Sequence, residues 1–130
     1  MATARILVCG GRDYVDREKV FNTLYDVCES RGWKYAEDAY GNWLPDCTII
    51  HGGAKGADTL ADEFAVVNWT GLLIFEADWD RYGKAAGFIR NKRMLDEGRP
   101  DLVIAFPGGT GTANMVSIAK AAGVEVLEIT

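Results

Sequence analysis

Residues 102–112, Leu-Val-Ile-Ala-Phe-Pro-Gly-Gly-Thr-Gly-Thr, decide the fold of this chain. The first five are apolar without alternation, which is typical of a parallel strand buried on both faces. A glycine-rich turn follows, and then a segment with apolar residues at helical spacing. In open α/β sheets this strand–turn–helix junction is where phosphate groups bind. The residues of the turn that we expect to bind a ligand are Pro107, Gly108, Gly109, Thr110, Gly111 and Thr112.

The same alternation of apolar runs and helical segments extends over the rest of the chain. Four further short apolar runs lie at 6–9, 48–50, 72–75 and 124–127. Because crossovers between parallel strands are right-handed, the pattern predicts a Rossmann-like three-layer α/β/α sandwich with a mainly parallel sheet of about five strands. A length of 130 residues predicts a single domain over residues 1–130.

Residues 33–46 interrupt this alternation, with four aromatic residues and no clear period. One interpretation is a loop or short hairpin packed against the sheet edge. The other is a lid or a subunit contact, because Trp and Tyr are enriched at interfaces.

Two more glycine-rich loops follow apolar runs. In the first, Gly10 and Gly11 permit a close backbone approach and Arg12 has the planar fork that suits a phosphate. Asp13 is interpreted as a helix cap or an acceptor from a ribose hydroxyl. The alternative is a tight turn with a solvated Arg-Asp pair.

In the second loop, residues 51–58, three glycines precede a well-patterned helix, which predicts an anion site made of backbone N–H groups. The candidate binding residues are Gly52, Gly53, Lys55 and Asp58. Asp58 is equally well explained as an acid of the first helical turn. His51 is expected to be a hydrogen-bonded, partly buried residue and not a catalytic one.

A basic cluster at 90–94 follows the third apolar run. Arg90 and Asn91 are candidates to point across the strand ends towards the loop at 107–112, although a solvated helix face is the alternative.

Composition excludes several classes of function. The net charge of −5 argues against a protein that coats nucleic acid, which needs a basic face. Three cysteines without a C-x-x-C pair, and one histidine, leave no plausible metal site. We also expect no cofactor and no membrane partner. Free thiols favour a reducing compartment, so the expected location is cytoplasmic.

Residues 107–112 resemble the Pro-Gly-Gly-x-Gly-Thr motif of the SLOG superfamily, which includes the "Lonely guy" phosphoribohydrolases and the DNA-processing protein A family. The resemblance covers nearly the whole chain and is strongest to the small YspA/YpsA-related branch, found in bacteria and their phages. The motifs that carry it lie at 10–13, 52–58, 90–94 and 100–109. It implies a nucleotide-type ligand at the glycine loops and a homo-oligomer.

The resemblance leaves catalysis open. In the phosphoribohydrolases a glutamate helps to cleave the N-glycosidic bond, but the matching position here is Met115, which has no acid or base. Asp13, Asp58 and Arg90 are therefore the catalytic candidates. The leading hypothesis is a sensor, sponge or relay that binds a nucleotide-derived molecule. The alternatives are a nucleotide N-glycoside hydrolase with rearranged carboxylates and a single-stranded nucleic-acid-binding protein.

Overall fold

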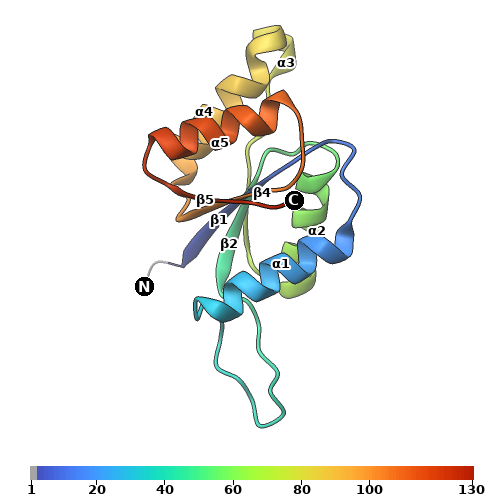
Figure 1. The fold of residues 1–130 in the computed structure, drawn as a ribbon, viewed down its shortest axis with the longest axis vertical. Coiled ribbons are helices and arrows are strands. Elements are labelled where there is room, and N and C mark those ends of the chain that lie inside the picture. The colour runs from blue at the N-terminus through green and yellow to red at the C-terminus, as the bar shows by residue number, and fades with distance from the viewer. Residues whose placement is uncertain (1–2) are drawn as a thin grey trace.

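A computed structural model describes residues 3–130 and contains one five-stranded sheet (Figure 1). Its strands are β1 (Ala4–Cys9), β2 (Cys47–His51), β3 (Gly71–Ile74), β4 (Leu102–Ala105) and β5 (Glu125–Glu128). All neighbouring strands are parallel, and their order is β3-β2-β1-β4-β5. The expected Rossmann-like fold is therefore confirmed.

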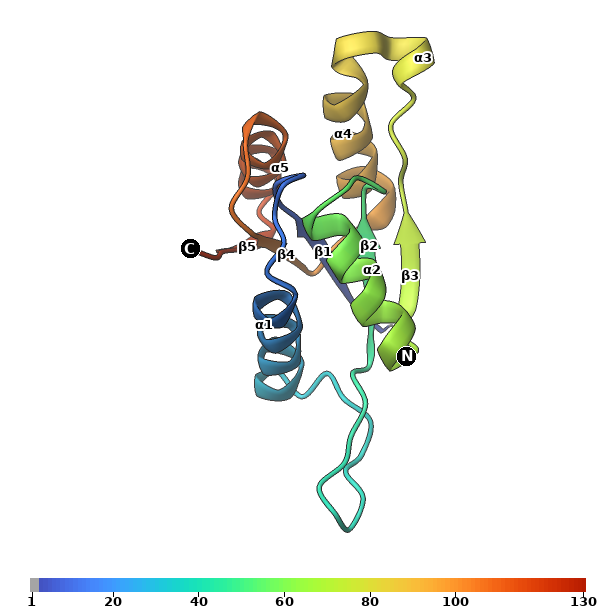
Figure 2. The same ribbon diagram turned by 90° about the vertical axis from the view of Figure 1, so that its right-hand side faces the viewer.

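Helices cover both faces of the sheet, as Figure 2 shows. α1 (Arg17–Ser30) and α2 (Ala57–Asn68) lie on one face, while α4 (Ala86–Gly98) and α5 (Thr110–Ala121) lie on the other. Alternate side chains of each inner strand serve the two layers. In β1, for example, Ile6 packs with α1 and α2, whereas Leu7 packs with α4 and α5. Burial of both faces explains why the inner strands contain the uninterrupted apolar runs 6–9, 49–50 and 102–105.

Three local features differ from the expectations. The helix that contains the basic cluster at 90–94 is α4, and it is preceded by a short helix α3 (Trp79–Tyr82) and a 3₁₀ turn η1 (Gly83–Ala85) that the sequence pattern did not predict. Asp16, and not Asp13, caps α1, because its side chain accepts a hydrogen bond from the Lys19 N–H at 3.0 Å. β3 is an edge strand that is only half-buried, since nothing pairs with its outer side within residues 3–130.

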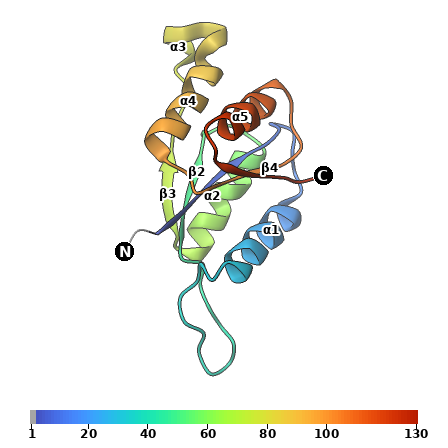
Figure 3. The same cartoon turned by 60° about the vertical axis from the view of Figure 1, so that its left-hand side comes forward.

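The strand order places a switch point between β1 and β4. The chain leaves β1 towards α1 on one face, and leaves β4 towards α5 on the other. The connections therefore diverge beyond the carboxyl ends of these two strands, where open α/β sheets form a crevice. Figure 3 shows α3, α4 and the start of α5 above this end of the sheet.

The aromatic segment at 33–46 lies at the opposite end. It forms a narrow arm that projects away from the sheet, closed by a bridge between Lys34 and Pro45 (Figures 1 and 2). Because the arm leads into the amino end of β2, it is remote from the crevice. The segment is hairpin-like, as one interpretation expected, but it projects away from the sheet and does not pack along its edge. It is not a lid over the carboxyl ends of the strands, and a subunit contact stays a prediction. Within residues 3–130, no helix has the length and apolarity needed to cross a membrane.

Candidate ligand-binding site

A cavity of about 410 Å³ lies at the switch point, between the loops after β1, β2 and β4 and the helix α4. Most of the residues expected to bind a ligand meet there. Those that line it are Gly10, Gly11, Arg12, Asp58, Arg90, Asn91, Gly109, Thr110, Gly111 and Thr112. Gly52 and Gly53 line a lateral cavity of about 240 Å³, which shares Arg12 and Arg90 with the main cavity. Lys55, Pro107, Gly108 and Asp13 line neither.

The amino end of α5 opens directly into the main cavity. Its N-cap is Gly109, and no side chain caps the helix. A Cβ atom added to Gly109 or Gly111 would meet no atom within 4 Å, so packing against this chain does not require a glycine at either position. A glycine in a helix costs about 1 kcal/mol relative to alanine. The bare N–H groups here are suited to an anion that approaches the backbone closely.

Other glycines have a packing role instead. A Cβ on Gly10 would lie 2.6 Å from the Cβ of Ala57, and one on Gly108 would lie 2.7 Å from the nitrogen of Gly11. The Gly11 N–H also donates to the carbonyl of Pro107 at 2.8 Å. These glycines allow the loops after β1, β2 and β4 to pack backbone against backbone, which builds the floor of the site.

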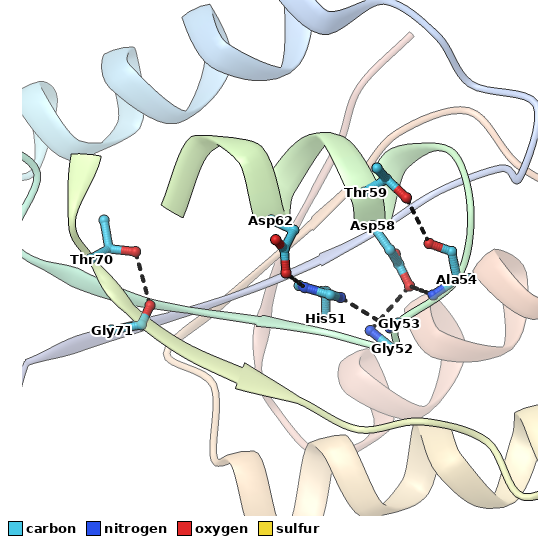
Figure 4. Close-up of polar contacts among 9 residues, drawn as sticks. All are labelled: His51, Gly52, Gly53, Ala54, Asp58, Thr59, Asp62, Thr70 and Gly71. Atoms are coloured by element: carbon cyan, nitrogen blue, oxygen red, sulfur yellow. Dashed lines mark hydrogen bonds and ion pairs between the residues drawn. The ribbon is translucent and has the colours of Figure 1, made fainter. Parts of the chain in front are cut away.

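The loop after β2 is held differently from the expected anion nest, as Figure 4 shows. One oxygen of Asp58 accepts from the N–H groups of Gly52, at 3.0 Å, and Ala54, at 3.2 Å. The Gly53 N–H donates to Nδ1 of His51 at 2.9 Å. Three consecutive N–H groups therefore point at protein acceptors, whereas the first N–H groups of α5 have no side-chain acceptor among residues 3–130.

His51 is buried and satisfied, as expected. Since Nδ1 accepts from Gly53, the ring proton of the neutral form lies on Nε2, which donates to a carboxylate oxygen of Asp62 at 2.7 Å. His51 lines neither of the two cavities. Its role is to hold the loop after β2.

Arg90 and Asn91 of α4 connect the loops. The Arg90 guanidinium donates to the carbonyl of Gly52, while the Asn91 amide donates to the Gly111 carbonyl and to Asn114, each at 3.0 Å. Burial lowers the pKa of Arg90; Asp58 opposes this shift and the like charge of Arg12 adds to it. These two residues therefore position α5 and the β2 loop, and also present polar atoms to the cavity.

The rim of the main cavity combines cations with aromatic rings. The Arg12 guanidinium carbon lies 5.4 Å from the centre of the Trp79 ring, a cation–π distance. Lys84 and the half-exposed Phe88 also line the cavity, whereas Tyr82 does not. Trp79, Lys84 and Phe88 lie outside the motifs of the sequence, which therefore gave no signal that they line the cavity.

The cavity contains few groups suited to acid–base or nucleophilic chemistry. Asp13 is exposed outside it, and Met115 is fully buried in the core beneath α5. Burial raises the pKa of Asp58, opposed by the hydrogen bond from the Ala54 N–H and by the charge of Arg90. Burial also raises the pKa of Cys9 to about 12, which keeps this thiol protonated. Within residues 3–130 no group of three or more His, Cys, Asp and Glu side chains could hold a metal ion.

Two comparisons relate this chain to known proteins. Residues 4–82 match the model of the family described as the YspA, cpYpsA-related SLOG family. The Gene 61 protein of Mycobacterium phage D29 is 35% identical over 131 residues, which cover 95% of this chain and 94% of that protein. The second similarity therefore extends over all three glycine loops.

Proposed function

This chain belongs to the YspA, cpYpsA-related SLOG family, and we propose that it binds a nucleotide or a nucleotide-derived molecule as a sensor, sponge or relay. Membership of the family confirms the resemblance found in the sequence and supports a nucleotide-related role. The finer proposal is that the phosphate binds at the amino end of α5 and that the rest of the ligand occupies the cavity beside it.

The bare start of α5 is the observation that carries this proposal. Gly109 and Gly111 lie where a side chain would meet only open space, and both line the cavity. Since the packing of this chain does not need these two glycines, we infer that they leave room for a ligand. The helix dipole and the unpaired N–H groups then favour a negatively charged group.

The charges and rings around the cavity fit the same ligand. Arg12 and Lys84 supply positive charge at the rim, and Trp79 and Phe88 offer apolar surfaces for a base. Within residues 3–130, Asp58 is the only carboxylate that lines this cavity, and it is already bound to two backbone N–H groups. A phosphate therefore meets a local excess of positive charge in a protein whose net charge is −5.

The two alternative functions receive less support. A hydrolase of the phosphoribohydrolase type needs a carboxylate at the scissile bond, and Met115, buried at the matching position, has none. Single-stranded nucleic acid needs a basic groove with stacking rings. The arm at 33–46, which is rich in aromatic residues, lies at the end of the sheet away from the cavity (Figure 1).

The test is native mass spectrometry of the purified protein, before and after incubation with a pool of ribonucleotides and dinucleotides. We expect a retained adduct whose mass identifies the ligand class. Titration of the identified nucleotide into Lys84→Gln should show a severalfold weaker affinity, because a cation that lines the cavity is lost. Lys92→Gln is the matched control, since Lys92 is an exposed lysine of α4 that pairs with Asp96 and lines neither cavity.

Each result has a distinct meaning. An intact adduct supports a binding protein, while a released base with ribose phosphate would transfer the proposal to the hydrolase. No adduct with any nucleotide in the pool, in a protein that unfolds cooperatively, would refute the proposed function.

The proposal also includes self-association inside the cell. Trp69 at the end of α2 is 86% exposed, and Ile74 at the end of the edge strand β3 is half-exposed. Such apolar groups beside an unpaired strand edge favour contact with a second copy. All three cysteines are free and buried, which suits a reducing cytoplasm. Light scattering during size-exclusion chromatography measures the oligomeric state directly.

A further inference from the structure

Glu76 is a carboxylate of the site that the sequence motifs do not indicate. It follows β3 by two residues and lines the lateral cavity together with Gly53 and Trp79. Its side chain is exposed, and it forms no hydrogen bond or ion pair with any residue from 3 to 130. Among the carboxylates that line the two cavities, Asp58 is bound to the loop backbone and Glu76 keeps both oxygens available.

The backbone beside Glu76 leaves room for its side chain. A Cβ on Gly53 would lie 2.9 Å from Cγ of Glu76 and 3.3 Å from Cγ2 of Ile74. Gly53 also has a φ of +69°, a conformation in which an L side chain is strained. The glycine therefore lets the stem of Glu76 lie across the loop after β2.

The lateral cavity and the main cavity share lining residues. Arg12, Ala54, Trp79 and Arg90 border both. Although both guanidinium groups border the cavity of Glu76, neither pairs with it, since Arg90 donates to the Gly52 carbonyl and Arg12 lies over Trp79. Glu76 thus adds a free acceptor to a lateral cavity that two guanidinium groups also border, while the bare N–H groups of α5 open into the main cavity.

We propose that Glu76 is a specificity residue that accepts hydrogen bonds from ribose hydroxyl groups, so that the site selects ribonucleotides over 2′-deoxyribonucleotides. An ionised carboxylate is purely an acceptor and repels phosphate, which therefore binds at the α5 end. The sugar of a nucleotide anchored there carries neighbouring hydroxyl donors, and a carboxylate at a strand end is a known partner of a ribose hydroxyl in α/β sheets. This inference rests on the proposed function, because it assumes that a nucleotide is the ligand.

The experiment compares the affinity of AMP, GMP, CMP and UMP with that of their 2′-deoxy analogues by isothermal titration calorimetry. The wild-type protein, Glu76→Gln and the control Asp80→Asn are tested. Asp80 is an exposed acid of α3 that lines neither cavity, so its variant removes the same charge from the same side of the molecule. Circular dichroism confirms that each variant is folded.

We expect the wild type to prefer at least one ribonucleotide by about tenfold, since a hydrogen bond to a charged group is lost with the hydroxyl. In Glu76→Gln this ratio should fall below about threefold, while 2′-deoxynucleotides bind as well as before or more tightly. Asp80→Asn should keep the wild-type ratio.

Equal binding of both sugars to the wild type, or an unchanged ratio in Glu76→Gln, would overturn the inference and leave the proposed function standing. Loss of discrimination between bases instead of sugars in Glu76→Gln would also overturn it and assign the carboxylate to a base amine. No binding of any nucleotide in this panel, together with no adduct in native mass spectrometry, would refute the proposed function as well.

Discussion

Gly111→Ala should separate the stability of this protein from its binding activity. An added Cβ at position 111 meets no atom within 4 Å and lies in the first turn of α5, on the cavity side. Because alanine is the better helix former, the free energy of unfolding should increase by about 0.5–1 kcal/mol. The same methyl group occupies space that the proposed phosphate needs, so nucleotide affinity should fall by at least tenfold.

Gly108→Ala is the contrasting variant. Its Cβ would lie 2.7 Å from the Gly11 nitrogen and 2.9 Å from the carbonyl carbon of Gly10, and would also overlap the Thr112 hydroxyl. Overpacking of this kind costs about 1–3 kcal/mol. Ala113→Gly serves as the control for helix propensity, because Ala113 is an exposed residue of the same turn that lines neither cavity.

Urea denaturation followed by tryptophan fluorescence measures stability, and calorimetry measures affinity for the nucleotide retained in native mass spectrometry. The reasoning would be refuted if Gly111→Ala bound that nucleotide as tightly as the wild type. It would also be refuted if Gly111→Ala were as unstable as Gly108→Ala, since the first turn of α5 would then be packed and not open.

Three further predictions concern single groups. Burial raises the pKa of Asp58 above its ordinary value of 3.8, so the stability contributed by this group is present below pH 3.8 and decreases as the pH rises through the raised pKa. Urea denaturation between pH 3.5 and about 7 should therefore show the wild type losing stability relative to Asp58→Asn with rising pH, and parallel curves would contradict this. Burial raises the pKa of Cys9 to about 12, so iodoacetamide at pH 8 should leave this thiol unmodified in the folded protein and alkylate it in urea. Peptide mass mapping would detect the difference. Rapid labelling of the folded protein would show an accessible thiolate instead. Trp69 ends α2 with a φ of 55° and is largely exposed, so Trp69→Gly should stabilise the fold by about 1 kcal/mol, as chemical denaturation would measure. The same variant should weaken any self-association that uses this side chain, as light scattering would measure. A loss of stability would mean that the indole ring packs against the chain.

The sequence alone determined the layers of this fold and indicated the end of the sheet at which the candidate site lies. The runs 6–9 and 102–106 are apolar on both faces because helices cover both sides of the inner strands. Their burial can therefore be recognised from the amino-acid composition of each run. The glycine loops also follow from local sequence, since each occupies a strand–helix junction. In a parallel sheet such junctions all meet at one edge, which brought Gly10, Arg12 and Gly109 to one cavity.

The tertiary structure decided which groups remain available to a ligand. The loops at 52–56 and 109–112 have similar compositions, yet Asp58 and His51 occupy the amides of the first, while those of the second open into the cavity. Glycine composition cannot distinguish them, because the difference lies in acceptors placed by packing. Glu76 and Phe88 line the two cavities although no motif surrounds them: Glu76 lies in the segment after β3, and Phe88 lies in α4. Local sequence encodes burial and backbone freedom, but the pairing of polar groups depends on distances that only the packed chain sets.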